Sequence, residues 1–503
     1  MKTRSTAAPR QTLAEILLPV LIALIFLAFT FSYYPFREKL QFDTDEGLNL
    51  MRSMLVEMGH PLYSETSSDQ PPLFNQILAL VFRLVGFNVN AARILVLLFS
   101  TLLVWAGAQF LQLTWGKGSA MAFLPLAIMV PRYLDLSVAV MIGVPSIALA
   151  LVSVLFAVFW HLSRREIWLV LSGCTLALSV LVKLFTGFLA PILLAGITFA
   201  AYTEAREEKF SWTTLRPAAI WSLSFAALGL VLGLLLVGPG NLPSILLPHL
   251  NAPSQEYFQT QGFGMNAHLR EAVPLLVLSM LGVILALYRR NWLALYPLAW
   301  AGLAYLLFTI YSPVFYHHQL LITIPAAILA AGAVGEGILT LLGARGEGDF
   351  LRLESLLAVA AVIGFGWTAV QYAPVLDREL MNSPRLTDFT LRATSGKLKV
   401  LRTMDNYIEQ TNWIMTDMPM YAFRVGRPVP PDLATFSQKR LSTGSLTEED
   451  ILAAMREYQP EQVLIARFQI PALEEYIQER YTLILSVEFF RLFLRNDLQP
   501  VNP

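Results

Sequence analysis

The chain has 503 residues, of which 55% are hydrophobic and 14% are charged, and its mean hydropathy is +0.56. At this composition, a soluble multidomain protein would have too few polar residues to cover its surface. The sequence therefore predicts an α-helical polytopic membrane protein. The 36 basic and 36 acidic residues cancel, which removes the electrostatic basis for binding nucleic acid. The single cysteine, Cys174, lies in an apolar segment and excludes both a disulfide framework and a cysteine-based metal site.

The first predicted element is an uncleaved membrane anchor over residues 13–33. It follows Lys2, Arg4 and Arg10 and is long enough to cross the hydrocarbon core. The aromatic residues at its end do not supply the small-residue cleavage site of a signal peptide. We therefore expect the N-terminus in the cytoplasm and the loop 34–71 on the outer face.

Further apolar segments follow, judged by their length and their lack of charge. They cover residues 72–87, 89–113, 117–131, 136–160, 166–182, 184–203, 215–238, 272–288, 291–311, 319–342 and 351–372. Basic residues fall in alternate loops, at Arg164–Arg165, Arg206 with Lys209, Arg289–Arg290 and Arg345 with Arg352, so all four loops can be cytoplasmic at once.

This topology requires an even number of crossings between Pro72 and Pro131. The Pro-bounded segment 117–131 is the best candidate for a short or re-entrant element. We therefore predict eleven crossings of the plasma membrane in a domain over residues 1–375, with an external loop at 238–271.

A small extracytoplasmic α/β domain is predicted over residues 376–503. Short apolar runs at 413–415, 462–465 and 482–485 alternate with helix-like stretches. Thr447 precedes an acidic turn, as a helix N-cap does, and Pro471 is typical of a helix start.

The acidic cluster Asp43-Thr44-Asp45-Glu46 lies in the first external loop. A carboxylate at the edge of a low-dielectric region is costly unless it is paired or used. A general base for a hydroxyl or amine acceptor needs a carboxylate held beside the substrate. The same residues also fit a solvated loop whose acids cap a helix, and taken alone they leave both interpretations open.

The rest of this loop carries Gly59-His60-Pro61-Leu62-Tyr63 and then Asp69-Gln70-Pro71-Pro72-Leu73. With the acidic pair it resembles the GT-C glycosyltransferases, and more narrowly the protein O-mannosyltransferase and aminoarabinose (lipid A) transferase group, most clearly over residues 43–93. Later matches are Arg132 with Asp135, the stretch 182–187, and 316–319 followed by Pro325. Some relatives have Glu-Lys before the Pro-Pro pair where this chain has Asp69-Gln70, so a cation that would meet donor phosphate is missing there.

The resemblance implies an integral-membrane glycosyltransferase. It would move a sugar from a polyprenyl phosphate, with inversion, to a lipid, glycan or protein acceptor on the outer face. Asp45 would be the general base, and Glu46 or Asp135 would orient the acceptor. A leaving lipid phosphate needs cationic donors, which would be Arg132, Lys183, His317 and His318. The loop residues beside the acceptor would be Asp43, Tyr63, Asp69 and Gln70.

Each of these side chains also has a structural interpretation. Lys183 can snorkel at a helix end. Arg132 and Asp135 can form an i,i+3 salt bridge, and His317 and His318 can bond to backbone at the interface.

The loop 238–271 contains His249, Glu256, Tyr257 and His268, a mixture that could ligate a metal ion. Their spacing matches no compact ligand pattern, so a substrate-gating loop is the favoured interpretation. Relatives differ in their use of a divalent cation. We therefore assign no cofactor and leave a divalent cation open.

Two other classes of membrane protein compete with a glycosyltransferase. A secondary transporter fits the number of apolar segments, but such proteins have related halves and ionisable groups near the middle of their helices. Here the ionisable residues gather at one face, and no symmetry between the halves is visible. A lipid-glycan ligase or polymerase would share the lipid substrate without the early Asp-Glu loop.

Overall fold

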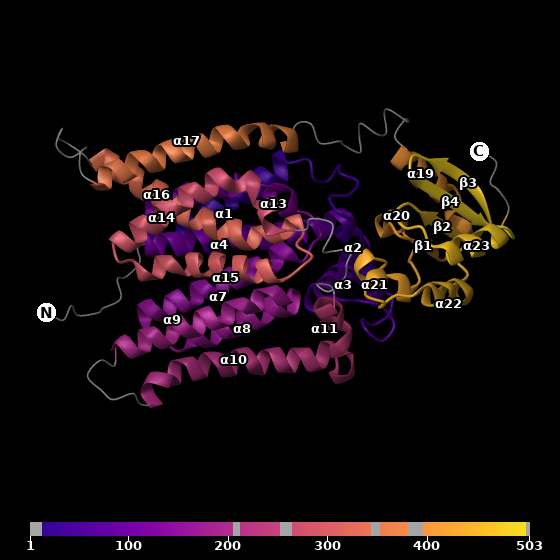
Figure 1. Ribbon diagram of the computed structural model, residues 1–503, viewed down its shortest axis with the longest axis horizontal. Helices are drawn as coiled ribbons and strands as arrows, with labels where there is room; N and C mark the ends of the chain where they lie inside the picture. Colours follow the sequence, from indigo (N-terminus) through magenta and orange to yellow (C-terminus); the bar gives the residue numbers. More distant parts are fainter. Residues whose placement is uncertain (1–12, 205–211, 252–263, 344–352, 381–395, 499–503) are drawn as a thin grey trace.

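The computed structural model describes residues 13–204, 212–251, 264–343, 353–380 and 396–498. These residues form a long helical bundle with a smaller α/β part at one end (Figure 1). The predicted fold class, a helical membrane protein with a small C-terminal α/β part, is confirmed.

The helices of the bundle lie side by side (Figure 1). They are α1 (Leu13–Tyr33), α4 (Val89–Thr114), α5 (Lys117–Ile128), α7 (Gly143–Ser163), α8 (Ile167–Val182), α9 (Leu189–Glu204), α10 (Trp212–Leu236), α14 (Val273–Tyr288), α15 (Tyr296–Ile310), α16 (Leu320–Gly343) and α17 (Leu353–Leu380). Within the described residues, nine helices are long and apolar enough to cross a membrane, and α3, α5 and α8 are shorter apolar helices. The count of eleven crossings stays a prediction.

Shorter elements connect the long helices. They are α2 (Thr44–Glu57), α3 (Leu73–Val85), α6 (Tyr133–Leu136), α11 (Leu242–Asn251) and α13 (Met265–Leu269), with 3₁₀ turns at Leu184–Phe188, Pro239–Asn241, Arg270–Ala272, Trp292–Leu295 and Tyr316–Gln319. Figure 1 places α2 and α3 at the end of the bundle that faces the α/β part.

The segment 117–131 forms α5, a short helix of 12 residues that lies inside the bundle, and whether it crosses the membrane stays a prediction. A Cβ atom on Gly335 of α16 would be 2.2 Å from the backbone nitrogen of Ser119, so the backbones of α5 and α16 touch. The α3 helix instead packs on α2, and its Phe82 ring lies 5.4 Å from that of Phe423 in the α/β part. The structure therefore favours 72–87 as the segment that stays outside the bundle.

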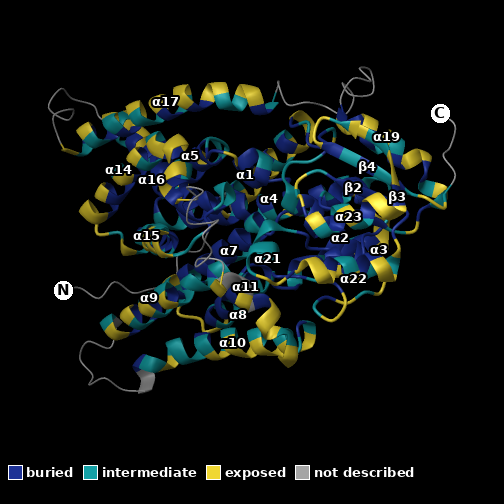
Figure 2. Cartoon of the chain, turned by 45° about the vertical axis from the view of Figure 1, so that its right-hand side comes forward, coloured by how far each residue is buried: buried dark blue, intermediate teal, exposed yellow. Residues whose placement is uncertain are grey.

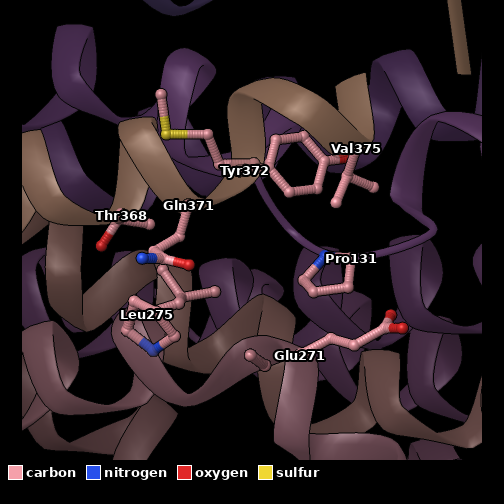
Figure 3. A pocket seen from close by; sticks show the side chains of 10 residues that line it. Pro131, Glu271, Leu275, Thr368, Gln371, Tyr372 and Val375 are labelled. Atoms are coloured by element: carbon pink, nitrogen blue, oxygen red, sulfur yellow. The ribbon is translucent and has the colours of Figure 1, made fainter. Parts of the chain in front are cut away.

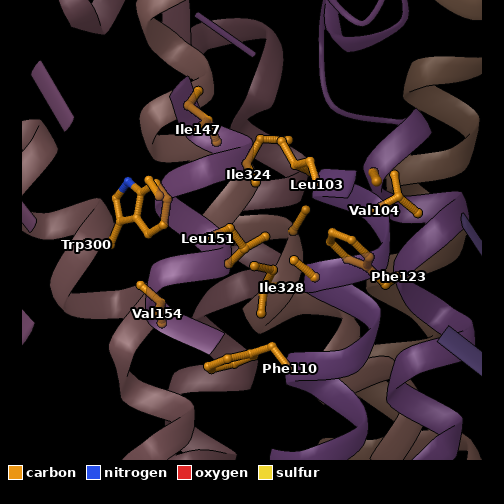
Figure 4. Close-up of a cluster of buried hydrophobic side chains, with 14 of the residues drawn as sticks. Leu103, Val104, Phe110, Phe123, Ile147, Leu151, Val154, Trp300, Ile324 and Ile328 are labelled. Atoms are coloured by element: carbon orange, nitrogen blue, oxygen red, sulfur yellow. The ribbon is translucent and has the colours of Figure 1, made fainter. Parts of the chain in front are cut away.

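The centre of the bundle is a cluster of buried hydrophobic side chains from α4, α5, α7, α15 and α16 (Figure 4). The outer helices differ, because α10 and α17 expose large apolar side chains such as Leu235 and Val370, 74% and 70% exposed (Figure 2). Helices that are apolar on both their inner and outer faces are typical of membrane spans.

The α/β part contains a four-stranded sheet in the order β1-β2-β4-β3, in which β1 is parallel to β2 and β4 is antiparallel to both of its neighbours. Its elements are α19 (Gly396–Asn406), a 3₁₀ turn at Ile408–Gln410, β1 (Ile414–Thr416), α20 (Pro419–Arg424), a 3₁₀ turn at Pro431–Leu433, α21 (Gln438–Ser442), α22 (Glu448–Tyr458), β2 (Gln462–Ile465), α23 (Pro471–Arg480), β3 (Tyr481–Val487) and β4 (Phe490–Arg495).

Most of these elements follow the sequence pattern. The three apolar runs form β1, β2 and β3, Thr447 caps α22 through a capping box, and α23 starts at Pro471. The sequence did not lead us to predict the fourth strand, β4. The helix α17 continues to Leu380, past the domain boundary predicted after residue 375.

The α/β part is seated on α2 at Gly47. A Cβ atom at this position would lie 2.6 Å from the backbone nitrogen of Met420 in α20. The guanidinium of Arg424, also in α20, donates to the carbonyl oxygens of Lys39 and Leu40 at 3.0 and 2.9 Å. The contact between α2 and α20 therefore requires close approach of the two backbones.

We expect Gly47→Ala to destabilise the protein by about 1–3 kcal/mol, because the added methyl group forces α20 away from α2. The midpoint of heat unfolding in detergent would fall. The matched control is Gly233→Ala in α10, where a Cβ meets nothing within 4 Å. A similar midpoint for both variants would contradict the close contact between α2 and α20.

Candidate active site

A cavity of about 410 Å³ lies where the end of the bundle meets the α/β part, a volume typical of small-molecule sites. Its wall combines α2, the loop after it, the ends of α6 and α8, the stretch before α16, and α21. The polar residues that line it are Asp43, Thr44, Asp45, Asn49, Arg52, Asp69, Gln70, Lys183, Tyr311, Tyr316, His317, His318, Thr435, Ser437, Gln438, Lys439 and Arg467.

Asp43 and Asp45 reach this cavity because the acidic cluster starts a helix. Asp43 is the N-cap of α2, and its carboxylate accepts from the backbone N–H of Asp45 at 2.9 Å. The second oxygen of Asp43 accepts from the Tyr316 hydroxyl at 3.0 Å. Asp43 is therefore held by two partners, and Asp45 follows it in the first turn of α2.

The environment of Asp45 makes this carboxylate more basic than usual. Burial raises its pKa to about 6, the nearby Asp43 and Asp69 charges raise it as well, and Arg52 and Lys183 oppose them. A carboxylate with this pKa is ionised near neutral pH and still accepts a proton readily. Asp45 is therefore a buried carboxylate in the wall of the cavity that can accept a proton near neutral pH.

Glu46 does not line the cavity, which does not fit its predicted role in orienting the acceptor. Its side chain is fully buried and pairs with Arg93, with N–O distances of 2.8 and 2.9 Å. Its carboxylate also accepts from the backbone N–H groups of Phe42 and Val140. A carboxylate with four donors is held rigidly, so Glu46 fixes the start of α2 against α4.

Asp135 and Arg132 also lie outside the cavity wall. The carboxylate of Asp135 pairs with Lys39 at 2.8 Å and accepts from the Tyr34 hydroxyl, so it does not form the considered bridge to Arg132. Arg132 is exposed, and its φ of 64° places it in the left-handed region before α6. The acceptor role of Asp135 and the phosphate role of Arg132 stay predictions.

Lys183 is a buried cation in the cavity and does not snorkel away from it. It follows α8 in an extended conformation and is 7% exposed. Burial lowers its pKa to about 8, while the charge of Asp45 acts in the opposite direction. A phosphate placed in the cavity would favour the charged form.

The two histidines differ in their surroundings. His318 receives a hydrogen bond from the Phe315 N–H at 3.1 Å, and its ring packs against those of Phe308 and Phe185, so its structural interpretation is favoured. His317 lines the same cavity, and its buried Nδ1 has no hydrogen-bond partner among the described residues. His317 is therefore the histidine with a polar atom available to a ligand.

The loop residues Asp69 and Gln70 line the cavity, whereas Tyr63 supports them from behind. The Tyr63 hydroxyl donates to the backbone carbonyl of Gln70 at 2.6 Å. Asp69 pairs with Lys439 at 2.8 Å and lies 3.9 Å from Arg52. The loop predicted to lie beside the acceptor thus reaches the cavity, and Tyr63 stabilises it through the hydrogen bond to Gln70.

The sequence interpretation missed Arg52, Lys439 and Arg467. Arg52 lies seven residues after Asp45, on the same face of α2, so the helical period could have identified it. Its guanidinium donates to Asn49 and Ser68, which joins α2 to the loop. Lys439 and Arg467 come from the α/β part, and no local pattern indicates them.

Within the described residues, no group of three or more His, Cys, Asp or Glu side chains is arranged to hold a metal ion. Of the candidates in the loop 238–271, Glu256 and Tyr257 lie outside the described residues, as does the side chain of His249. His268 is bonded to the Val314 carbonyl at 3.0 Å.

A second cavity lies beside α17 and is much smaller, about 30 Å³. Figure 3 shows Thr368, Gln371 and Tyr372 of α17 facing Pro131 and Leu275 across it. This volume holds about one or two water molecules and excludes a sugar.

Residues 69–236, about a third of the chain, match the dolichyl-phosphate-mannose-protein mannosyltransferase family. A search among curated proteins finds no match.

Solved structures match over almost the whole chain. ArnT from Cupriavidus metallidurans bound to undecaprenyl phosphate is 13% identical with a TM-score of 0.58, covering 96% of this chain and 98% of ArnT. The archaeal oligosaccharyltransferase AglB from Archaeoglobus fulgidus, in complex with an inhibitory peptide and a dolichol-phosphate, is 11% identical with a TM-score of 0.56, covering 90% of this chain and 69% of AglB. The fold expected from the resemblance is confirmed.

Proposed function

We infer that this chain, a GT-C glycosyltransferase by fold, transfers a sugar from a polyprenyl-phosphate donor to an acceptor on the outer face of the membrane. The observation that carries the proposal is that Asp45 and several cations share one cavity at the end of an apolar bundle. A prenyl chain could lie among the apolar helices while its phosphate and sugar occupy the cavity.

The charge of the cavity suits such a donor. Among the described residues it is lined by the cations Arg52, Lys183, Lys439 and Arg467 and by the carboxylates of Asp43, Asp45 and Asp69, which is one more cation than carboxylate. A sugar phosphodiester carries one negative charge, and the phosphate that leaves carries a second. Cations fixed at the site therefore stabilise the charge that develops in the transition state.

The proposed reaction is a single displacement. Asp45 accepts the proton of the acceptor hydroxyl or amine as the acceptor atom bonds to the anomeric carbon. The bond between that carbon and the phosphate oxygen breaks, and the lipid phosphate leaves with the electron pair. Attack opposite the leaving group inverts the anomeric configuration. Lys183 and the other cations receive the charge of the leaving phosphate.

We propose the plasma membrane as the site of action, with the N-terminus in the cytoplasm. The α7 helix runs from Gly143 at the cavity to Ser163, about 30 Å away at 1.5 Å per residue, and Arg164 and Arg165 follow it. Basic loops favour the cytoplasmic side, which assigns the cavity and the α/β part to the outer side.

The direct test uses the purified chain in liposomes that contain a polyprenyl-phosphate-linked sugar. We expect loss of the sugar from the lipid and formation of free polyprenyl phosphate when the acceptor is present. Mass spectrometry of envelope glycans and glycoproteins, with and without the chain, would identify sugar and acceptor. Tracer uptake into the same liposomes without sugar transfer would instead indicate a transporter.

The rate should depend on pH through Asp45 and Lys183. Burial raises the pKa of Asp45 to about 6, so kcat/KM should fall about tenfold per pH unit below that value, as the base becomes protonated. Burial lowers the pKa of Lys183 to about 8, so kcat/KM should fall again above that value, as the cation is lost. Initial rates across pH test both limbs.

The Lys183→Arg variant identifies the alkaline limb. A guanidinium stays charged in this range, so the variant should keep the acid limb and lose the alkaline limb. An unchanged alkaline limb in this variant would rule out Lys183 as its cause.

A further inference from the structure

The α/β part supplies one wall of the cavity and is tied to the loop opposite. The hydroxyl of Thr435 donates to the Ser67 carbonyl at 2.7 Å, and the Thr435 N–H donates to the Ser67 hydroxyl at 3.2 Å. The Ser67 N–H donates to the Pro431 carbonyl at 3.1 Å. These bonds join segments that are hundreds of residues apart in the chain, and they fix the position of α21 (Figure 1).

Lys439 of α21 enters the cavity from this wall. Its ammonium group lies 2.8 Å from one oxygen of Asp69, and the side chains of the two residues are only 12% and 10% exposed. The other oxygen of Asp69 lies 3.9 Å from Arg52. Among the described residues, one carboxylate thus lies between two cations at this corner of the cavity.

Gln70, next to Asp69, is an uncharged residue in the same wall. On this side of the cavity, the loop before α3 therefore contributes a carboxylate and an amide but no cation. The positive charge facing that loop comes from α2, through Arg52, and from the α/β part, through Lys439.

We propose that Lys439 binds the donor phosphate, so that the α/β part completes the donor site and does more than cover it. This inference rests on the proposed function. An ammonium has three protons on a flexible stem, so Lys439 can keep Asp69 as a partner and donate a further proton to a phosphate oxygen. Donor binding then requires that the α/β part is packed against α2 and the loop before α3.

The competing explanation is that Lys439 only holds the two parts of the chain together, as a clamp. In that case its effect depends on the ion pair with Asp69. If Lys439 instead binds the phosphate, its effect depends on the positive charge that it places at this corner of the cavity. Moving the cation to position 70 separates the two, because Gln70→Lys places a positive charge in the same wall without restoring the bond to Asp69.

The experiment compares Lys439→Gln, Asp69→Asn and the double variant Lys439→Gln/Gln70→Lys in the liposome assay. The control is Lys399→Gln, which makes the same change at an exposed position on α19 of the same part. Donor kcat and KM are measured, and binding of sugar-free polyprenyl phosphate is measured separately by the shift in unfolding temperature.

We expect Lys439→Gln to lower donor kcat/KM and phosphate binding by about 10- to 100-fold, the range for a lost charge-assisted hydrogen bond. The double variant should recover to within about fivefold of the wild type, and Lys399→Gln should match the wild type. Asp69→Asn should keep phosphate binding, since Lys439 remains.

Two results would overturn the proposal. One is normal phosphate binding in Lys439→Gln. The other is an equal loss in Lys439→Gln and Asp69→Asn without recovery in the double variant, which is the behaviour of a clamp. A wild type that binds polyprenyl phosphate without transferring sugar would count against the proposed function alone, and one that does neither would remove both proposals.

Discussion

Replacing Asp45 by Asn is expected to lower kcat by about 10²- to 10⁴-fold, the contribution of a positioned general base. The amide has nearly the same shape and keeps the first turn of α2, since the cap comes from Asp43. It cannot accept a proton at neutral pH. Turnover of a polyprenyl-phosphate sugar in liposomes measures the effect.

Two comparisons make this result specific to the proton acceptor. Binding of sugar-free polyprenyl phosphate should be retained in Asp45→Asn, because the cations of the cavity are unchanged and one nearby negative charge is removed. Asp405→Asn makes the same substitution at an exposed position on α19 and should leave turnover unchanged. Full activity of Asp45→Asn would exclude this residue as the base.

Replacing Arg93 by Ala is expected to destabilise the protein by about 3–5 kcal/mol, because it leaves the carboxylate of Glu46 buried without its ionic partner. Both side chains of this pair are 0% exposed. Arg93 also donates to the carbonyl oxygens of Phe36 and Lys39 at 2.6 and 2.7 Å, which would lose these bonds. The midpoint of heat unfolding in detergent measures the loss.

The matched control is Arg83→Ala, which removes an arginine that is 67% exposed and paired with Glu57. A pair in water is worth about 0–1 kcal/mol, so this variant should unfold close to the wild type. If Arg93→Ala were as stable as Arg83→Ala, Glu46 would not be a buried anchor for α2, and its predicted role beside the acceptor would need to be considered again.

Several features of the site could be predicted because they depend on neighbouring residues. An acidic residue before an amphipathic stretch starts a helix, which brings Asp45 to the end of α2. The same helical period extends to Arg52, seven residues after Asp45. In the α/β part, Phe490, Leu492 and Leu494 alternate with less buried residues in β4, so the signal for the missed strand is also local.

Other features depend on contacts between distant segments. Glu46 and Asp45 are adjacent acids, yet the first pairs with Arg93 of α4 in the buried interior and the second faces the cavity. The α3 helix is as apolar as a short span, and its contacts with α2 and with Phe423 reveal that its apolar face meets protein. Apolar length alone does not distinguish lipid from a protein partner.

The sequence by itself determined the membrane class, the acidic loop, most strands of the α/β part and the resemblance to GT-C enzymes. These follow from composition, periodicity and motifs, which are properties of short stretches. The tertiary structure decided which acids and cations share the cavity, because the position of Lys439 beside Asp69 is set by the packing of α20 on α2 and by the bonds between Thr435 and Ser67. Contacts across 370 residues of chain leave no local pattern in the sequence.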